Sequence, residues 1–391
     1  MDNARIALAI REVCAGDGVV MSSPETESKK RCALEARKLV FQPASAHGGA
    51  PEDAERAEQT DRAAKLSILT DARDRLPVGA GAAGESHKPG LAFYNQTIRT
   101  DFCAPFVIAK LLFHPTPDAV YGFPRARRLA CVDSPHQRIE VWDTPQLGRL
   151  FTLDGRPMTS VGDEFIYHEC MVHPAALAHP APKKALVLGG GDGGAARQLL
   201  KHACIERVVV AELDEHVVRM ARTHLPDVHG GALDDARVEL VIGDAARFVD
   251  ATNERFDLVV FDLTPPDSPA AELYTQAFYA RLKRAMMPRA ALSMHLGSPH
   301  FHAARVADLL RELHASFALV DMMSAFVPLY GSQWLMAIAS DTLDAAALFA
   351  HDIDERLSMR NIAGLRYYDA TLHAALFTVS RAVRDKLGAD L

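Results

Sequence analysis

The sequence has 391 residues and a formal net charge of −7 at pH 7, which is enough chain for two domains or for one large domain with an appendage. Hydrophobic residues make up 49% of it and charged residues 24%, proportions that exclude a fully disordered or collagen-like chain. The acidic balance argues against a protein that coats nucleic acid. A mildly acidic surface suits cationic ligands, and it equally suits simple solubility.

The cysteines and the apolar segments favour a cytoplasmic protein. The start, MDNARIALAI, lacks the long apolar stretch of a secretory signal. Residues 102–113, FCAPFVIAKLLF, are too short to span a bilayer, so we expect no membrane partner. None of the cysteines forms a CxxC pair, and we expect free thiols of a reducing compartment, with no disulfide framework and no metal cluster. The six are Cys14, Cys32, Cys103, Cys131, Cys170 and Cys204.

Residues 1–125 are predicted to be an extension, largely disordered or loosely structured. Residues 23–90 are rich in Ala, Gly, Ser and charged residues and contain almost no aromatic residue. Such a segment cannot bury enough apolar surface to offset the entropy lost on ordering. Residues 91–125 are more apolar but show no clear period.

A small antiparallel β domain with a linking helix is predicted for residues 126–180. HQRIEVWDT at 136–144 alternates and places Ile139 and Val141 on one side. A turn at TPQLG and the segments RLFTLDG and RPMTS continue the same pattern. EFIYHECMVHPAALAH then has helical spacing, and Asp163 stands where it would cap that helix.

Residues 181–391 are predicted to form a doubly wound, mostly parallel α/β sheet. Buried apolar strands alternate with helical segments from GGGDGGAARQLLKH onward, which is the pattern of a parallel sheet covered on both faces. Ligands of such sheets bind beyond the carboxyl ends of the strands. The predicted strands lie within 183–190, 206–214, 236–243, 254–264 and 290–298.

The first two strand ends carry a glycine loop and two acids. The glycines at 189–191 permit a tight turn and a close approach by a ligand. Asp192 follows them, where an acid would repel the pyrophosphate of NAD, so it favours a ligand with a positive charge. Glu212 ends the second strand, 18 residues after Gly194, and an acid at about this distance binds ribose hydroxyls. Taken alone, Glu212 would fit a surface carboxylate as well.

The next two strand ends are also acidic. Asp244 suits the amino group of adenine, and it suits an N-cap of the following helix equally well. Asp262 closes the apolar run FDLVVF. Four successive polar strand ends indicate an adenosine-type pocket without phosphate recognition, and therefore an S-adenosyl ligand instead of NAD.

Several segments resemble the polyamine aminopropyltransferase (spermidine/spermine synthase) family. The resemblance covers about residues 130–385, and its most specific parts are LDG with DEFIYHE, GGGDGG, AELD and FDLVVFDLT. It implies a methyltransferase-like Rossmann fold preceded by a small antiparallel β domain. It also implies decarboxylated S-adenosylmethionine as co-substrate, no separate cofactor or metal, a small polyamine acceptor, and a homodimer or homotetramer.

The resemblance implies roles for individual residues. Asp262 would take a proton from the attacking amine, and its burial would raise its pKa toward usefulness. Without the family, Tyr167 and His168 would be core residues of a helix and Gln137 a strand surface residue. The implied donor contacts are Gln137 at the nucleoside, Glu212 at the ribose, Asp192 at the aminopropyl ammonium, and Asp244, Ala245 and Pro269 around the adenine. The implied acceptor contacts are Tyr167, His168 and Tyr330.

One departure from the family bears on the acceptor. The family usually has Asp–x–Thr–Asp–Pro or Asp–x–Ser–Asp–Pro after the fourth strand, whereas this chain has DLTPPDSP, with Pro265 in place of the second acid. The spermine-producing branch resembles this chain in lacking that acid. Asp267 could substitute for it, in a loop that the prolines stiffen. Putrescine is the favoured acceptor, with spermidine, agmatine and cadaverine as alternatives.

Other functional classes fit less of the sequence. An S-adenosylmethionine-dependent methyltransferase would use the same nucleoside pocket, but it would need neither Asp192 nor a channel from the β domain. A non-catalytic polyamine-binding relative would not need the sulfonium side of the site. An oxidoreductase is disfavoured because Asp192 would repel a dinucleotide phosphate.

Overall fold

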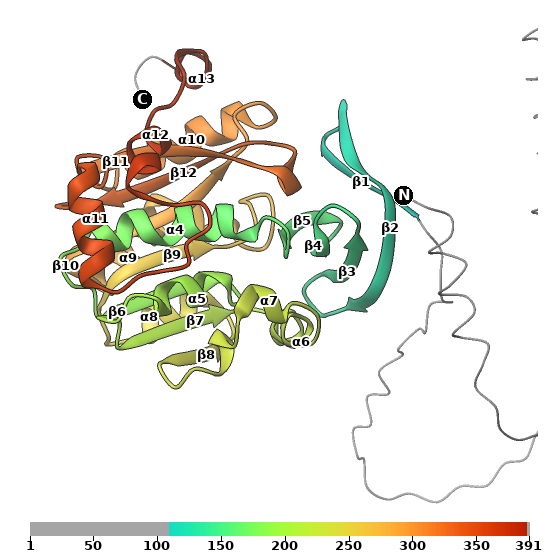
Figure 1. Cartoon of the computed structure of the whole chain (residues 1–391), viewed down its shortest axis with the longest axis horizontal. Coiled ribbons are helices and arrows are strands. Elements are labelled where there is room, and N and C mark those ends of the chain that lie inside the picture. Colours follow the sequence, from blue (N-terminus) through green and yellow to red (C-terminus); the bar gives the residue numbers. More distant parts are fainter. Residues whose placement is uncertain (1–108, 389–391) are drawn as a thin grey trace, which may run out of the picture. The chain divides into compact units, whose positions relative to one another are not determined.

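A computed structural model describes residues 109–388 (Figure 1). Its first part is an antiparallel sheet with the strand order β1-β2-β3-β4-β5. The alternation of apolar and polar residues explains how the third and fourth strands pair. Ile139 lies opposite Leu153 and Val141 opposite Phe151, and all four side chains are buried. The strands are Ala109–Thr116 (β1), Ala119–Asp133 (β2), Arg138–Thr144 (β3), Gly148–Leu153 (β4) and Arg156–Ser160 (β5).

The small sheet begins earlier than the sequence predicts. Residues 109–125, assigned to the loosely structured extension, form β1 and the first part of β2, and that part of the prediction is wrong. Phe113 pairs with Tyr121 across the two strands, with ring centroids 5.4 Å apart, and it is buried. The local sequence shows no clear period because this burial depends on side chains from other elements. The prediction for residues 1–108 lies outside the described residues.

A second, seven-stranded sheet has the order β11-β12-β10-β9-β6-β7-β8. The five strands from β10 to β8 run parallel, while β12 is antiparallel to both β10 and β11. The predicted mostly parallel, doubly wound sheet is therefore confirmed. The strands are Lys184–Gly189 (β6), Arg207–Glu212 (β7), Val238–Ile242 (β8), Phe256–Asp262 (β9), Met286–Gly297 (β10), Leu319–Val327 (β11) and Ser332–Ser340 (β12).

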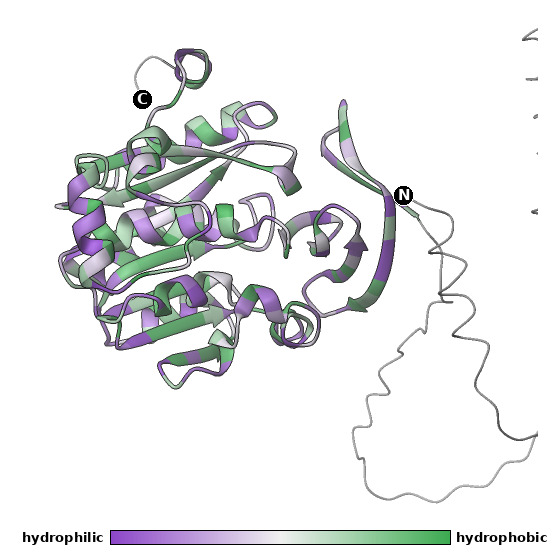
Figure 2. Cartoon of the chain, in the orientation of Figure 1, coloured by the Kyte–Doolittle hydropathy of each residue, from purple (hydrophilic) through white to green (hydrophobic). Residues whose placement is uncertain are grey.

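Helices cover both faces of this sheet. One apolar core joins it to α4 (Glu164–Ala178), α5 (Gly194–Leu200), α11 (Ala350–Met359) and α12 (Ala370–Leu376). The core on the opposite face includes α8 (Ala245–Ala251), α9 (Gln276–Arg284), α10 (Ala303–His314) and α13 (Arg381–Leu387). Figure 2 shows the central strands mostly in the hydrophobic colour and the helices in both colours, as expected for strands buried on two faces.

The two sheets are joined through helices. Residues of β3 and β4, among them Ile139 and Phe151, share a core with Val217 and Met220 of α6 (Glu215–His224), which is followed by α7 (Pro226–His229). Helix α4 follows β5 directly, and almost all of its residues are buried. Short 3₁₀ turns lie at Ala232–Asp234, Ala271–Tyr274 and Pro328–Tyr330. None of the helices within residues 109–388 has the length and apolar character needed to cross a bilayer.

Asp163 precedes α4, but it does not cap that helix as predicted. Its side chain makes no cap hydrogen bond. Instead, one carboxylate oxygen accepts from the Ser160 hydroxyl at 2.5 Å and the other accepts from the Leu329 backbone N–H at 2.6 Å. The residue therefore ties β5 to the 3₁₀ turn at Pro328–Tyr330, a long-range contact that local spacing could not reveal.

Candidate active site

The carboxyl ends of the parallel strands open into a cavity of about 700 Å³. The chain moves from β6 to β7 and β8 on one side and then returns to β9 and β10 on the other, so β6 and β9 border the point where strand order reverses. Ligands of open α/β sheets bind at this point. All eleven residues predicted for the site line this one cavity: Gln137, Tyr167, His168, Asp192, Glu212, Asp244, Ala245, Asp262, Asp267, Pro269 and Tyr330.

Both the backbone conformation and the lack of space for a side chain require glycine in the loop after β6. Gly189 and Gly190 have φ angles of 76° and 71°, in the left-handed region. A Cβ on Gly189 would lie 2.3 Å from the Asp262 carbonyl oxygen, and one on Gly194 would lie 2.2 Å from the His168 ring. The glycines thus bring the loop against β9 and α4, which places Asp192 beside the residues of those elements.

Glu212 lies at the end of β7 and lines the cavity. Its carboxylate accepts hydrogen bonds from the backbone N–H groups of Gly191 at 3.1 Å and Asp214 at 3.0 Å. Burial raises its pKa to about 7, and the two backbone hydrogen bonds only partly oppose that effect. Gln137 lies near, with its amide nitrogen 3.3 Å from the Asp214 carboxylate, which also accepts from Ser134.

Asp244 fits both interpretations of its position. Its side chain caps α8 by accepting from the Ala246 N–H at 2.8 Å. It also lines the cavity together with Ala245 and Pro269. A cap that faces a pocket retains acceptor capacity for a ligand, because an ionised carboxylate offers about four lone-pair sites.

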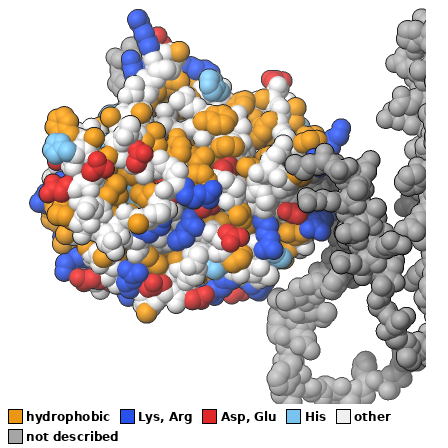
Figure 3. Space-filling view, in the orientation of Figure 1, with side chains coloured by type: hydrophobic (Ala, Val, Ile, Leu, Met, Phe, Trp, Pro, Cys, Tyr) orange, Lys and Arg blue, Asp and Glu red, His pale blue; other side chains and the backbone are white. Residues whose placement is uncertain are grey.

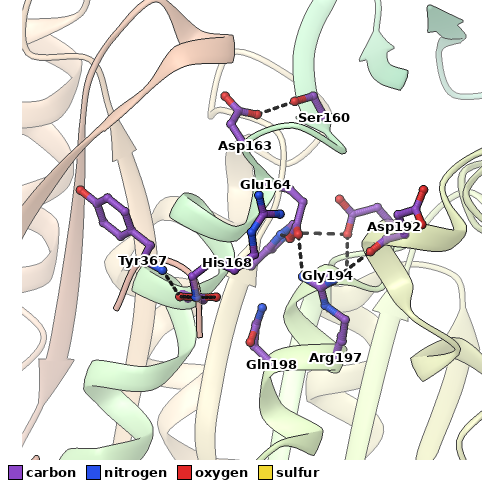
Figure 4. Close-up of polar contacts among 12 residues, drawn as sticks. Ser160, Asp163, Glu164, His168, Asp192, Gly194, Arg197, Gln198 and Tyr367 are labelled. Atoms are coloured by element: carbon purple, nitrogen blue, oxygen red, sulfur yellow. Dashed lines mark hydrogen bonds and ion pairs between the residues drawn. The ribbon is translucent and has the colours of Figure 1, made fainter. Parts of the chain in front are cut away.

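The buried imidazole of His168 lies between Glu164 and Asp192 (Figure 4), and the Asp262 carboxylate is close to it as well. The His168 Nδ1–H donates to Glu164 Oε2 at 2.8 Å, and Glu164 is itself paired with Arg197 at 2.6 Å. On the other side, His168 Nε2 lies 3.7 Å from both Asp192 Oδ1 and Asp262 Oδ2. Burial disfavours the imidazolium, but the Asp192 charge and the other carboxylates outweigh it and raise the pKa of His168 well above its usual value.

Burial and the charge of His168 together set the ionisation of Asp192 and Asp262. Burial raises the pKa of Asp192 to about 6, although the His168 charge opposes this. For Asp262, burial alone would raise the pKa, but contacts with His168 and Tyr167 outweigh it and the pKa is lowered. The predicted upward shift of Asp262 is therefore wrong, because the sequence did not reveal that a protonated histidine lies beside it.

Asp262 also has unused acceptor capacity. Its Oδ2 atom is buried and has no hydrogen-bond partner among the described residues. A buried unsatisfied acceptor is costly, so this oxygen is suited to an N–H group brought by a ligand. One side-chain atom each of His168, Asp192 and Asp262 lies within 4.8 Å of the others. The two carboxylates can accept hydrogen bonds from an ammonium, whereas the protonated His168 can only donate and would have to lose its proton to bind a metal ion.

Comparisons with known proteins show the family of the chain. A family profile described as "Spermine/spermidine synthase domain" matches residues 164–348. A polyamine aminopropyltransferase of Nitrosomonas europaea is 44% identical over 272 residues, covering 70% of this chain and 84% of the relative. The chain belongs to the spermine/spermidine synthase family. It is a polyamine aminopropyltransferase.

More distant members of the family are similar over the same region. The polyamine aminopropyltransferase of Sulfolobus acidocaldarius is 34% identical over 274 residues, covering 70% of this chain and 91% of its own length. A spermidine synthase solved with the transition-state analogue AdoDATO superposes with a TM-score of 0.64 at 31% identity, covering 69% of this chain and 91% of its own. The Thermotoga maritima spermidine synthase superposes with a TM-score of 0.61 at 30% identity, covering 69% of this chain and 90% of its own.

Aromatic side chains form the wall of the aminopropyltransferase pocket next to Asp262. Tyr330 and Trp334 have ring centroids 4.3 Å apart, and Tyr167 lies 6.1 Å from Tyr330. Tyr330 is fixed by its hydroxyl, which donates to the Met158 carbonyl at 2.7 Å. His295 stacks on Trp334, and its Nε2–H donates to the Leu263 carbonyl at 2.7 Å, beside the Tyr274 hydroxyl. Such a wall suits an alkylammonium chain, which gains from both apolar contact and cation–π attraction.

Sequence reasoning missed several residues of this aminopropyltransferase site. Glu164 could have been found, because it precedes His168 by four residues and so shares its helix face. The others gave no local signal, since they come from β5, β10, α10 and β12. They are Arg156, His295, Arg305 and Trp334.

Proposed function

We propose that this enzyme transfers the aminopropyl group of decarboxylated S-adenosylmethionine to a primary amine of a small polyamine, and that putrescine is the favoured acceptor. The products would be spermidine and 5′-methylthioadenosine. The observation that supports this most directly is the group formed by Asp192, His168 and Asp262, beside a nucleoside side that carries Glu212 and Asp244. A ligand with an adenosine and a nearby ammonium matches both sides in charge.

The donor would lie across the ends of β6 to β9. Glu212 would accept the ribose hydroxyls, and Asp244, Ala245 and Pro269 would border the adenine. Asp192 would hold the aminopropyl ammonium, because the positive charge of the ammonium complements the negative charge of the Asp192 carboxylate. Gln137 would approach the nucleoside from the small sheet. Since ribose hydroxyls bind a carboxylate better than a carboxylic acid, donor binding would strengthen as the pH rises through about 7, the pKa of Glu212.

The transfer itself is a displacement at carbon. The acceptor amine must be neutral to attack, although an alkylamine has a pKa of about 10. Its lone pair would form the new C–N bond while the electrons of the C–S bond return to the sulfonium, which leaves as a neutral thioether. Asp262, anionic before the reaction because its pKa is lowered, would take one proton from the incoming ammonium and then pass it to solvent. The nitrogen becomes a secondary ammonium as the C–N bond forms, so one proton is released per transfer.

Product analysis by mass spectrometry tests this proposal. The full chain would be incubated with decarboxylated S-adenosylmethionine and, separately, putrescine, cadaverine, agmatine or spermidine. We expect methylthioadenosine together with spermidine from putrescine. Consumption of S-adenosylmethionine itself, with a methylated product, would instead indicate a methyltransferase. If no amine released methylthioadenosine, the proposal would be refuted.

We also propose that the enzyme works in the cytoplasm as a homodimer or homotetramer, without a separate cofactor and without a nucleic-acid or membrane partner. The described cysteines Cys131, Cys170 and Cys204 are free thiols, in agreement with a reducing compartment. On the face seen in Figure 3, basic and acidic side chains are interspersed, unlike the basic stripe of a nucleic-acid-binding surface. Light scattering coupled to gel filtration would give the oligomeric state.

A further inference from the structure

The carboxylate of Asp163 is buried close to the pocket but takes no part in the proposed chemistry. It is 2% exposed and is not among the residues that line the cavity. Its oxygens accept from the Ser160 hydroxyl at 2.5 Å and from the Leu329 N–H at 2.6 Å. Figure 4 shows Asp163 directed toward Ser160, apart from the group of His168 and Asp192. A buried carboxylate is costly unless it is hydrogen-bonded, so these two contacts explain how the fold accommodates it.

The Leu329 end of this contact lies at the tip of a long hairpin. Strands β11 and β12 pair as far as Val327 opposite Ser332, and residues 328–331 turn between them. Backbone groups in such a turn have no ladder partner and need partners elsewhere. The Leu329 N–H finds its partner in Asp163, which comes from the junction of the small sheet with α4.

Tyr330, the next residue of the turn, belongs to the pocket wall. Its hydroxyl donates to the Met158 carbonyl of β5 at 2.7 Å, and its ring centroid lies 4.3 Å from that of Trp334. Burial is the main cause of its raised pKa, and the Asp163 charge adds to it, which shows that the carboxylate lies near the phenol as well. Two successive residues of the turn, Leu329 and Tyr330, are thus held to the small sheet and its junction with α4.

Gly331 closes the turn against the small sheet. Its φ angle is 61°, and a Cβ at this position would lie 2.8 Å from the Tyr121 ring of β2. Tyr121 lines the cavity, and burial together with the Asp163 charge raises its pKa. Because packing here is close, a shift of the turn would displace the pocket side chains Tyr330 and Tyr121 together.

We propose that Asp163 is a positioning residue for acceptor binding: by holding the Leu329 N–H, it fixes the turn that places Tyr330 in the wall beside the acceptor amine. Asp163 acts through this turn and does not touch substrate. The inference rests on the proposed aminopropyl transfer. Glu212 and Asp244 come from β7 and the start of α8, on the other side of the point where strand order reverses, so the contact should affect the acceptor and not the donor.

Steady-state kinetics of the full chain test this role. Decarboxylated S-adenosylmethionine and putrescine, or the amine that the wild type uses best, would be varied separately. In Asp163→Ala, which removes both acceptor oxygens, KM for the amine should rise about tenfold, while KM for the donor should stay within about twofold of the wild type.

The conservative variant separates position from charge. Asp163→Asn keeps a carbonyl for the Leu329 N–H, and its amide can donate to the Ser160 hydroxyl. It should therefore keep KM for the amine within about threefold of the wild type. If Asp163→Asn is as impaired as Asp163→Ala, the negative charge and not the hold on the turn is what matters, and the inference is overturned.

Asp321 of β11 offers a matched control. Its carboxylate accepts from the Ala345 and Ala346 N–H groups at 2.9 and 3.3 Å, and it does not line the cavity. Asp321→Ala thus removes contacts of the same kind. It should lower the unfolding temperature about as much as Asp163→Ala does, and it should leave KM for the amine unchanged. An equal rise of this KM in both variants would assign the effect to lost stability and overturn the inference.

Fluorescence gives a readout that does not depend on turnover. The chain has two tryptophans, so a Trp142→Phe background leaves Trp334 as the only one. Movement of Tyr330 away from this ring should expose it and shift its emission to longer wavelength in Asp163→Ala, but not in Asp163→Asn or Asp321→Ala. Calorimetry of methylthioadenosine binding reports that each variant keeps the donor side folded. A raised KM without an emission shift would contradict the action through Tyr330.

The outcomes distinguish the inference from the function on which it rests. If the wild type transfers aminopropyl groups but Asp163→Ala keeps the wild-type KM for the amine, Asp163 does not position the acceptor wall. If the wild type transfers to no amine at all, the proposed function is overturned, and the acceptor role of Asp163 falls with it even where the emission of Trp334 shifts.

Discussion

Helix α4 carries two buried histidines that are in opposite states of charge. His168 faces Glu164, Asp192 and Asp262, and these carboxylates raise its pKa. His173, five residues further along the helix, is equally buried, and burial lowers its pKa to about 3. The same residue type on one helix is thus a cation where it lines the pocket and neutral in the core.

Hydrogen bonds around His173 require this neutral state. The guanidinium of Arg360 can only donate, so His202 must accept through Nδ1 at 3.2 Å. His202 then donates from Nε2 to His173 Nδ1 at 3.0 Å, and His173 donates from Nε2 to the Gln198 oxygen at 3.2 Å. A proton added anywhere along this chain would place two donors face to face. The core cluster therefore stabilises structure, while the pocket cluster holds charge for chemistry.

The largest expected difference between the clusters lies in the pocket. Asp262→Asn should reduce kcat for aminopropyl transfer by roughly 10²–10⁴-fold, because the amide cannot accept the proton or offset the developing ammonium charge. Thermal unfolding should change much less than kcat, since Asp262 Oδ2 makes no direct hydrogen bond among the described residues and loses only the charge pair with His168 at 3.7 Å. Steady-state kinetics and calorimetry test this together. Full transfer by the variant would remove Asp262 from the catalytic role.

The opposite result is expected in the core. Arg360 donates to the carbonyls of Ala176, His179 and Pro180 at 2.6–2.9 Å. Arg360→Leu should lower the free energy of unfolding by about 2–4 kcal/mol, because buried acceptors lose their partners. Denaturant unfolding measures this loss, and kcat should stay within about twofold of the wild type. A variant with normal stability and impaired kcat would contradict the division between the two clusters.

A third comparison concerns pH. His168→Gln removes the cation beside Asp262, so burial is no longer offset and the pKa of Asp262 should rise. We expect kcat/KM to fall about tenfold near pH 6 and to recover as the pH rises, because Asp262 is then ionised again. His173→Gln is the matched control and should keep the wild-type shape of the pH profile. Equal profiles for wild type and His168→Gln would show that His168 does not set the ionisation of Asp262.

The smallest expected effect is on the pH dependence of stability. The pKa of His173 is about 3 in the folded chain and about 6.5 when unfolded. As the pH falls through this window, the unfolded chain takes up the proton first, so the stability present above pH 6.5 is lost. His173→Gln should reduce the slope of unfolding free energy between pH 5 and 6.5 by up to about 1.4 kcal/mol per pH unit. Denaturant unfolding at several pH values measures it, and an unchanged slope would indicate that His173 is protonated in the core.

Residues at strand ends were the most predictable part of the site. Glu212, Asp244 and Asp262 each follow an apolar run, and the ends of parallel strands must meet at one edge of a sheet. Arg156, Arg305 and Trp334 were not predictable, since they reach the cavity from a hairpin, a helix and an antiparallel strand far apart in sequence. The small sheet was predicted from residue 126, but β1 was missed because its burial depends on other elements.

The sequence by itself determined the parallel sheet, the glycine loop and the acids at the strand ends, because periodicity and backbone conformation are local properties. Only the tertiary structure decided the charge of each group. The DLTPPDSP segment shows a carboxylate at Asp262 and another at Asp267, yet the first owes its lowered pKa to His168 of α4 and the second is paired with two arginines. Ionisation follows burial and neighbouring charge, and both come from residues that folding brings together.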